Sequence, residues 1–306
     1  MNKKKFALGI GFLVAIVFAL SIGYLAFLKY GQTDNLIPLI IIDDLGQSIN
    51  ITKTPQRIVS ISASCTEILY ALGCGDKIVA VDKTSDYPPE VKDKPCVGPA
   101  SNLNVELIVN LDPDIVFAWG GSEKAINRLK ELNITVVAIY PRSISGIMDD
   151  IGLIGKIMNK EAEASNLISE MQNRLDTIKG KLSNLTVGEK PLVYYELYRL
   201  GSTAGPGTVS DEMISLAGGI NIAANQTIQY PTLSSEYIIS MNPDVIIVLS
   251  GYTSIDEIKS RSGWQSINAV KNDRIYQIDK GLTSFTPRIV LGIEQMARWF
   301  HPDLFE

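Results

Sequence analysis

Short apolar runs alternate with helical stretches along the chain from residue 55 onward. In the first half, the segments between the apolar runs repeat their apolar positions every three or four residues, which is typical of helices packed on one face. The predicted strands there are Ile58–Ile61, Ile78–Val81, Ile115–Ala118 and Val136–Ile139, and the predicted helices are Thr66–Leu72, Val105–Asn110 and Glu123–Leu132. This alternation predicts βαβ units and a mostly parallel sheet.

The strands stop between Ser143 and about Leu185, where only helical spacing is found. Such a segment is too long for an ordinary crossover, so we expect a helical spine joining two lobes, with a break at Met158-Asn159-Lys160. Alternation then resumes and predicts a second α/β lobe. Its predicted strands are Leu192–Tyr195, Val245–Leu249 and Ile275–Ile278, and its predicted helices are Asp211–Leu216 and Thr286 to Phe300.

One segment of the first lobe aligns without a gap on a segment of the second. The first begins at Glu106 and the second at Glu236, and in each a Pro-Asp pair ends a short helix before a buried strand. A Glu in the first turn of a helix is explained by the helix dipole alone. Because the two occupy identical positions in two equivalent lobes, a shared functional role is an equally good interpretation.

Residues 6–28 carry no charge and follow three lysines, Lys3 to Lys5. A helix of this length spans about 34 Å and crosses the ~30 Å hydrocarbon core of a bilayer. The lysines predict that the N-terminus stays in the cytoplasm and that the rest of the chain is exported. The segment is either an uncleaved anchor or a cleaved signal peptide. No cysteine lies near the end of this segment, so we expect no bacterial-type lipoprotein anchor.

These patterns divide the chain into five parts. We predict a transmembrane anchor or signal peptide (1–28), a linker with an N-terminal hairpin (29–54), an N-terminal lobe (55–142), an interlobe helix (143–185) and a C-terminal lobe (186–306). With 306 residues and 46% apolar composition, each lobe is large enough to bury its own core.

Charge and residue usage exclude several functions. The net charge of −5 disfavours nucleic acid as a partner. A single histidine, His301, and three cysteines without a C-x-x-C motif disfavour zinc sites and most His-dependent nucleophiles, so we predict no metal site. Cys65 is expected to be buried, and a disulfide between Cys74 and Cys96 remains open.

The body of the chain, roughly residues 55–305, resembles the iron-chelate and cobalamin substrate-binding proteins of ABC importers. The resemblance begins with Pro55-Gln-Arg-Ile-Val-Ser-Ile-Ser-Ala-Ser-Cys-Thr-Glu-Ile-Leu-Tyr-Ala-Leu-Gly73. It continues in order through Ser85-Asp-Tyr-Pro-Pro89, Asn104-Val-Glu106, Ala118-Trp-Gly-Gly121, Ala217-Gly-Gly219 and Thr286-Pro-Arg288. Single motifs of this kind are weak, but their order and spacing together are specific.

The resemblance implies two Rossmann-like lobes joined by a long backbone helix, the class III periplasmic-binding-protein fold. It implies a ligand in the interlobe cleft and delivery to an ABC permease, with no cofactor, no catalytic residue and no enzyme activity. One Glu per lobe docks on the permease in such proteins, and the matching residues are Glu106 and Glu236. An alternative is a membrane-anchored sensor or surface protein that uses the same fold without transport.

Ligands of open α/β sheets bind outside the carboxyl ends of the strands. Besides Tyr87, these ends contain Gly98–Asn102, Trp119-Gly120 and Tyr140 in the first lobe, and Glu196–Arg199, Tyr230, Tyr252 and Leu282–Arg288 in the second. The candidates for ligand binding among them are Tyr87, Trp119, Gly120, Tyr198, Arg199, Tyr230 and Arg288. We expect Trp119 to stack on a large flat ligand, with the glycines after it leaving room for that ligand. Arg288 is expected either to bind a ligand carboxylate or to form a salt bridge near the last helix.

The ligand class stays open between a corrinoid and a ferric siderophore or haem. Tyr87-Pro-Pro and Trp119-Gly-Gly are most similar to the cobalamin-binding members of the family. Residues 98–102 carry no aromatic side chain where those members tend to have one, which favours the other ligands.

Overall fold

The computed structural model describes residues 38–305, and residues 40–49 and 55 onward form one compact unit. The predicted anchor or signal peptide at residues 6–28 lies outside the described residues. Within the described range, no helix is both long enough and apolar enough to cross a bilayer.

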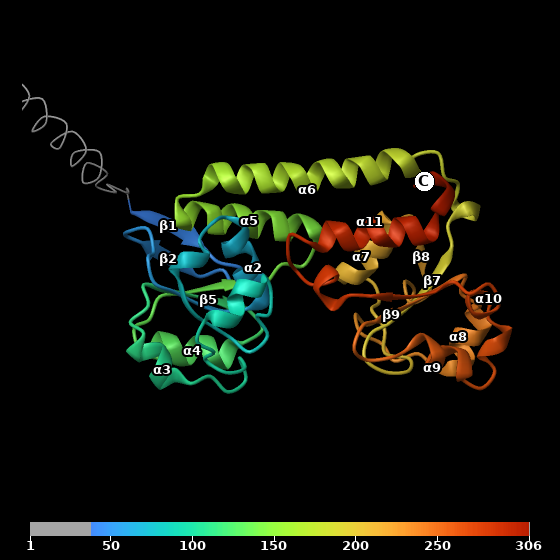
Figure 1. The fold of residues 1–306 in the computed structure, drawn as a ribbon, viewed down its shortest axis with the longest axis horizontal. Helices are drawn as coiled ribbons and strands as arrows, with labels where there is room; N and C mark the ends of the chain where they lie inside the picture. Colours follow the sequence, from blue (N-terminus) through green and yellow to red (C-terminus); the bar gives the residue numbers. More distant parts are fainter. Residues whose placement is uncertain (1–37, 306) are drawn as a thin grey trace, which may run out of the picture. The chain divides into compact units, whose positions relative to one another are not determined.

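Two four-stranded parallel sheets have the same topology (Figure 1). The N-lobe sheet contains β3 (Ile58–Ile61), β4 (Ile78–Val81), β5 (Ile115–Trp119) and β6 (Val136–Ile139). The C-lobe sheet contains β7 (Leu192–Glu196), β8 (Ile220–Asn221), β9 (Val245–Leu249) and β10 (Ile275–Ile278). Their orders are β4-β3-β5-β6 and β8-β7-β9-β10, so in both sheets the first strand lies between the second and the third. The predicted α/β class with two equivalent lobes is confirmed.

Helices cover both sheets, which explains why most strand residues are buried. The N-lobe has α2 (Ala63–Ala71), α3 (Val105–Asn110) and α4 (Glu123–Glu131). The C-lobe has α7 (Val209–Leu216), α8 (Ser235–Met241), α9 (Ile255–Ser260), α10 (Asn268–Lys271) and α11 (Ile289–Phe300). The 3-10 turns are η1 (Gly75–Lys77), η2 (Pro89–Asp93), η3 (Val187–Glu189), η4 (Trp264–Ser266), η5 (Lys280–Leu282) and η6 (Pro302–Leu304).

The segment predicted as a spine is a pair of helices, α5 (Ile144–Met158) and α6 (Glu161–Leu182). The break is where the sequence predicts it, because Asn159 ends α5 in the left-handed conformation, with φ of 55°. The chain reverses there, and Gly155 of α5 lies so close to Ala164 of α6 that a Cβ at Gly155 would stand 2.5 Å from that of Ala164. Thus α6 is the long helix that runs along both α5 and α11, and the sequence did not predict that the chain reverses direction at the break (Figure 1).

The repeated Pro-Asp pairs fasten the first strand of each sheet. Asp114 donates its backbone N–H to the carbonyl of Arg57 at 2.8 Å, and its carboxylate accepts the N–H groups of Gln56 and Arg57 at 2.8 and 3.0 Å. Asp244 bonds Leu192 in the same way, at 2.8 and 3.0 Å. The sequence identified these residues as helix breakers, and the structure adds that each sets the register of a strand.

The predicted N-terminal hairpin is present as β1 (Leu39–Ile42) and β2 (Ser48–Ile51). Its turn packs on β6, where the backbone N–H of Ala138 donates to the Asp43 carboxylate at 3.2 Å and Asp44 bonds Tyr140. Asp150 of α5 is only 2% exposed. The pKa of Asp150 is raised to about 9, mainly by burial and secondly by the neighbouring carboxylate of Asp44. This carboxyl group is therefore neutral at pH 7.

The three cysteines are free, so the structure contains no bond between Cys74 and Cys96. Cys65 is fully buried as predicted, and burial raises the pKa of its thiol, which makes it a poor nucleophile near neutral pH.

Candidate functional site

The topological switch points of the two sheets lie at the carboxyl ends of their first and third strands. Helices leave these neighbouring strands for opposite sides, and a crevice for ligands forms there in open α/β sheets. In the N-lobe the strand ends are followed by Ser62 and Gly120, and in the C-lobe by Leu197 and Ser250. These are the edges from which most of the ligand residues were predicted.

Trp119, Tyr140 and Arg142 form an aromatic wall on the N-lobe, here called the N-wall. The rings of Trp119 and Tyr140 meet edge to face with centroids 4.8 Å apart, and the guanidinium of Arg142 lies 3.7 Å from the centre of the Tyr140 ring. A Cβ at Gly120 would stand 2.6 Å from the Cβ of Tyr140. Gly120 is therefore needed for the contact with Tyr140, and the predicted ligand space beside it is already filled.

Phe285 of the C-lobe reaches the same indole from the other side. Its ring centroid lies 4.9 Å from that of Trp119, with an interplanar angle of 40°. Phe285 lies within the segment 282–288 that the sequence placed at the ligand edge, although it was not among the residues chosen as candidates.

Tyr198, Arg199, Tyr230 and Tyr252 form the C-wall on the C-lobe. The three tyrosines are 58%, 61% and 53% exposed, in chain order, although such side chains are usually half-buried. The Tyr198 and Tyr252 rings are 5.0 Å apart at 71°. Arg199 is exposed and forms no ion pair within residues 38–305. Exposed aromatic rings beside an unpaired cation are suited to bind a flat ligand that carries a negative charge.

The two walls lie within electrostatic range of each other. Burial, then the phenol of Tyr198, raises the pKa of Tyr230, and Tyr140 and Arg142 of the N-wall also act on it. Of the predicted set, Trp119 and Gly120 thus belong to the N-wall and its flank, and Tyr198, Arg199 and Tyr230 belong to the C-wall.

Arg288 and Tyr87 lie together at an interlobe contact. Arg288 donates two hydrogen bonds of 2.7 Å to the carboxylate of Glu67 on α2, and its guanidinium lies 3.6 Å from the centre of the Tyr87 ring. The Glu67 carboxylate raises the pKa of Arg288 further. Of the two roles expected for Arg288, the structure shows the salt bridge, and a ligand anion would have to compete with Glu67 for it.

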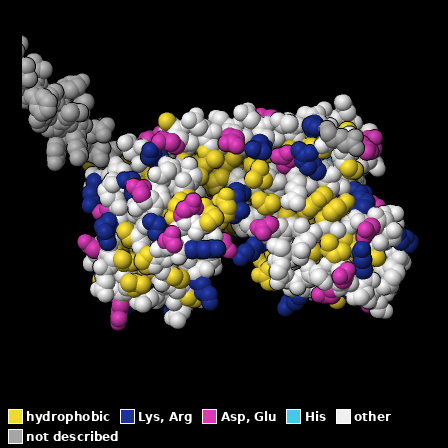
Figure 2. Space-filling model, in the orientation of Figure 1, with side chains coloured by type: hydrophobic (Ala, Val, Ile, Leu, Met, Phe, Trp, Pro, Cys, Tyr) yellow, Lys and Arg dark blue, Asp and Glu magenta, His cyan; other side chains and the backbone are white. Residues whose placement is uncertain are grey.

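A cavity of about 520 Å³ lies beside this contact, beneath α6. Figure 2 shows hydrophobic side chains gathered beneath α6 on this face. The lining includes Tyr70, Leu167, Met171, Val290 and Leu291. Two further contacts join the lobes: Lys280 pairs with Asp86 at 3.2 Å, and the N–H of Ile144 donates to Glu212 at 2.9 Å. The lobes are therefore held together by polar contacts at three points of this structure.

Glu106 and Glu236 occupy equivalent places on α3 and α8. Each is the second residue of its helix and is exposed, and Asn104 and Ser234 cap the two helices by accepting N–H bonds of 3.0 and 3.1 Å. Neither carboxylate forms an ion pair with another described residue. The helix backbone and the Ser234 side chain lower the pKa of Glu236, so this carboxylate is ionised and available to a basic partner.

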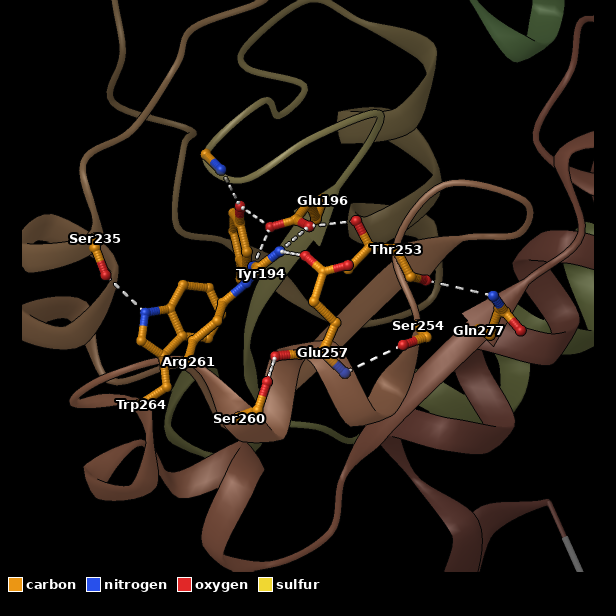
Figure 3. A network of polar contacts seen from close by, with 11 residues as sticks. Tyr194, Glu196, Ser235, Thr253, Ser254, Glu257, Ser260, Arg261, Trp264 and Gln277 are labelled. Carbon is orange, nitrogen blue, oxygen red and sulfur yellow. Dashed lines mark hydrogen bonds and ion pairs between the residues drawn. The ribbon is translucent and has the colours of Figure 1, made fainter.

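Glu196 is fully buried at the end of β7, although the sequence placed it at the ligand edge. Burial alone would raise its pKa, but hydrogen bonds from Arg261 and then Thr253 outweigh burial and lower the pKa. Figure 3 shows Arg261 forming two bonds of 2.6 and 2.8 Å to Glu196, with Thr253 and Tyr194 donating at 2.7 and 2.9 Å. All of these partners come from the C-lobe.

No group of three or more His, Cys, Asp or Glu side chains within residues 38–305 is arranged to hold a metal ion. His301 ends α11 and lies 3.1 Å from the carbonyl of Gly218 through Nε2. Burial lowers its pKa, so its role is structural.

The sequence profile of the periplasmic binding proteins matches residues 58–282. The chain belongs to the periplasmic binding protein family. Its parallel sheets, its interlobe helix and this match confirm the class III fold and the substrate-binding role of ABC importers predicted from the motifs.

Three similar proteins illustrate the family's range. The chain is 36% identical over 286 residues to an uncharacterized ABC transporter substrate-binding lipoprotein, YvrC, of Bacillus subtilis, which covers 91% of this chain and 90% of that one. It is 33% identical to a cobalamin-binding protein of Halobacterium salinarum, over 85% of this chain and 73% of the other. A crystal structure of a possible iron-binding periplasmic solute-binding protein from Staphylococcus epidermidis has a TM-score of 0.72 and 31% identity, covering 81% and 100% of the two chains.

Proposed function

We propose that this family member captures a corrinoid, with cobalamin as the first candidate, between the N-wall and the C-wall and delivers it to an ABC permease. The observation that carries the proposal is the pair of aromatic walls at the switch points of both sheets, containing Trp119 and Tyr140 on one side and Tyr198, Tyr230 and Tyr252 on the other. Large flat ligands are bound by stacking of this kind. The similarity to the cobalamin-binding protein of H. salinarum supports the ligand class.

A ferric chelate or haem is the second candidate. Arg142 and Arg199 are exposed, come from opposite lobes and form no ion pair within residues 38–305. The two propionate carboxylates of haem would neutralise both, whereas a corrinoid offers a single phosphate. The similarity to the possible iron-binding protein of S. epidermidis is consistent with this candidate.

The ligand is identified by titrating the full chain, in detergent micelles, with cyanocobalamin, haemin and ferrichrome in a calorimeter. We expect saturable binding of cyanocobalamin with a submicromolar Kd. Saturation by haemin or ferrichrome alone would keep the capture role and overturn the corrinoid assignment. Absence of binding to all three would overturn the proposed capture of these ligand classes.

We also propose that Glu106 and Glu236 dock on basic residues of the permease. Two exposed carboxylates at matching positions would give the protein a two-point register on its partner. The double variant Glu106→Ala with Glu236→Ala should bind ligand normally and lose uptake in cells. The matched control replaces two other exposed first-turn carboxylates, Glu161 and Asp256, and should retain uptake. Uptake that survives in the docking variant would refute the assignment.

The protein is proposed to act outside the cytoplasm, either anchored by residues 6–28 or released after cleavage. The family is periplasmic, and the B. subtilis relative is a lipoprotein. The mass of the mature protein, recovered from both the membrane and the soluble extracytoplasmic fraction, distinguishes the two forms, since cleavage would remove the apolar segment.

A further inference from the structure

The turn that carries Tyr198 and Arg199 is bonded directly to the segment that leads into α8. In this turn, residues 197–202, the N–H of Leu197 donates to the carbonyl of Ser202 at 2.9 Å. Ser202 then pairs with Thr232 in an antiparallel bridge, and the N–H of Leu233 donates to the carbonyl of Gly201 at 2.9 Å. Ser234 caps α8, so only Leu233 lies between the bridged residue Thr232 and the cap of the docking helix.

Gly201 makes the close approach possible. Its φ is +80°, a conformation that side chains rarely adopt, and a Cβ there would clash with the carbonyl of Leu233. Its N–H donates to the hydroxyl of Tyr194 at 3.0 Å, and that hydroxyl donates to Glu196. The turn is thus fixed on one side to the α8 segment and on the other to the buried carboxylate.

A second connection between the same two elements runs through the interior of the C-lobe (Figure 3). Arg261 holds Glu196 with a bidentate pair, and its guanidinium lies 4.7 Å from the centre of the Trp264 ring. The indole N–H of Trp264 donates to the hydroxyl of Ser235, in the first turn of α8, at 2.7 Å. Ser235 is the direct neighbour of Glu236. Since Glu196 and Trp264 are fully buried, this chain of contacts has little freedom to rearrange in parts.

The N-lobe has no counterpart of this arrangement in its described residues. Ile61 is the N-lobe position equivalent to Glu196. Each of the two residues ends the first strand of its sheet and pairs with the third strand, Ile61 with Ala118 and Glu196 with Val248. Ser62 follows Ile61 and caps α2 at once. The start of α3, which carries Glu106, is bonded instead to Val97, where the N–H of Asn104 donates at 2.8 Å.

We propose that Glu196 and Arg261 are positioning residues that hold the 197–202 turn and α8 as one unit, so that a ligand on the C-wall changes the presentation of Glu236 and leaves Glu106 unaffected. The inference rests on the proposed function for the roles of Tyr198 and Glu236. A ligand shifts the docking helix only as far as it binds one arrangement of the unit better than another. The contacts supply the physical connection, and the coupling itself is what the experiment measures.

The first arm of the test needs no ligand. Hydrogen–deuterium exchange is followed in peptides covering 197–203, 234–242 and 105–111 of the full chain in detergent micelles. In Arg261→Met we expect exchange about tenfold faster in the first two peptides and unchanged exchange in the third. Tyr276→Phe, at a C-lobe ring stacked on Trp299 away from this network, is the matched control and should change none. Unchanged exchange at 234–242 in Arg261→Met would overturn the proposal.

Ser235→Ala keeps the inference testable if Arg261→Met does not fold. It removes only the acceptor of the Trp264 N–H and leaves the Glu196–Arg261 pair intact. We expect faster exchange at 234–242 alone, and Arg261→Lys, which keeps the charge but loses the two-pronged geometry, should lie between wild type and Arg261→Met. Exchange in Ser235→Ala equal to that of wild type would count against the interior connection.

The second arm adds cyanocobalamin, haemin or ferrichrome, whichever binds. We expect protection of 197–203 and a changed exchange rate at 234–242 but not at 105–111, and we expect Ser235→Ala to weaken the response at 234–242 alone. Protection at 197–203 without a response at 234–242, or equal responses at 234–242 and 105–111, would overturn the coupling. If no ligand binds, the proposed function fails, and the first arm still decides whether the turn and α8 form one unit.

Discussion

The two lobes share their sheet topology, here called the frame, and differ in the residue that is buried at the end of the first strand. Both sheets have the same strand order, both fasten their first strand with an Asp after a Pro, and both expose a Glu in the first turn of an equivalent helix. At the equivalent strand ends, however, the N-lobe buries Ile61 and the C-lobe buries Glu196 with Arg261. The frame therefore repeats, and the residues around the ligand edge do not.

This difference extends to the loops and to the charge state of buried carboxyl groups. In the N-lobe, β3 passes into α2 through Ser62 alone, whereas in the C-lobe residues 197–208 separate β7 from α7 and carry part of the C-wall. Asp150, on the N-lobe side, is neutral because burial raises its pKa, and Glu196 is ionised because Arg261 and Thr253 outweigh its burial. Two buried carboxyl groups of one chain thus have opposite charge states, because only Glu196 has a cation and hydroxyl donors beside it among the described residues.

The largest expected effect comes from breaking the C-lobe pair. Arg261→Met leaves Glu196 charged and unpaired in the interior and should lower the free energy of unfolding by about 3–5 kcal/mol. Ile61→Val at the equivalent N-lobe position should cost only about 0.5–1.5 kcal/mol. Urea denaturation measures both. Replacing Glu196 and Arg261 together by Met should recover most of the loss, and a double variant as unstable as the single one would contradict this account of the pair.

The Asp residues that fasten the first strands should have matching effects. Asp114→Ala leaves two backbone N–H groups without an acceptor, and Asp244→Ala leaves one backbone N–H and the Asn268 amide. Each should cost about 2 kcal/mol in urea denaturation. If only one of the two variants lost stability, only one sheet would depend on this contact. The two lobes would then differ in their energetics although they share a topology.

A smaller effect, of opposite pH dependence to that of Glu196, is expected at Asp150. The pKa of Asp150 is about 9 in the folded chain and ~3.9 in the unfolded chain. Between these pH values the unfolded chain is ionised at this residue and the folded chain is not, so the free energy of unfolding falls as pH rises. Asp150→Asn removes this cost and should raise the Tm clearly at pH 8 and by less at pH 5.

Calorimetry at the two pH values checks the Asp150 prediction. Asp303→Asn is the control, because Asp303 is an exposed carboxylate outside α5 that does not act on Asp150, and its replacement should leave Tm nearly unchanged. A gain that is larger at pH 5 than at pH 8 would mean that Asp150 is ionised in the folded chain.

The frame was predictable because it depends on patterns that repeat locally. The strands were read from short apolar runs, and the lobes from the alignment of Glu106 with Glu236; both follow from residues close in sequence. The two-residue strand β8 was missed, since a run that short gives no period. The chain reversal at Asn159 was missed because the residue marks a break without fixing the direction taken after it.

The site was predictable only in part, because its decisive contacts join residues distant in sequence. Trp119, Tyr198 and Tyr230 were predicted from their positions at strand ends, and the structure places them on the two walls. Arg288 pairs with Glu67, and Glu196 is buried against Arg261, although no local sequence pattern relates the members of either pair. The sequence therefore left the role of Arg288 open and assigned Glu196 to the ligand edge. The glycine after Trp119 showed that something lies close, but not that Tyr140 fills the space.

The most direct test of the central claim, capture between two aromatic walls, is the calorimetric affinity of the full chain for cyanocobalamin in three variants. We predict that Trp119→Leu on the N-wall and Tyr252→Leu on the C-wall each raise Kd about tenfold or more, while Trp299→Leu, at a stacked pair outside the cleft, leaves it unchanged. Affinity lost in only one of the wall variants, or in neither, would contradict binding between the two lobes.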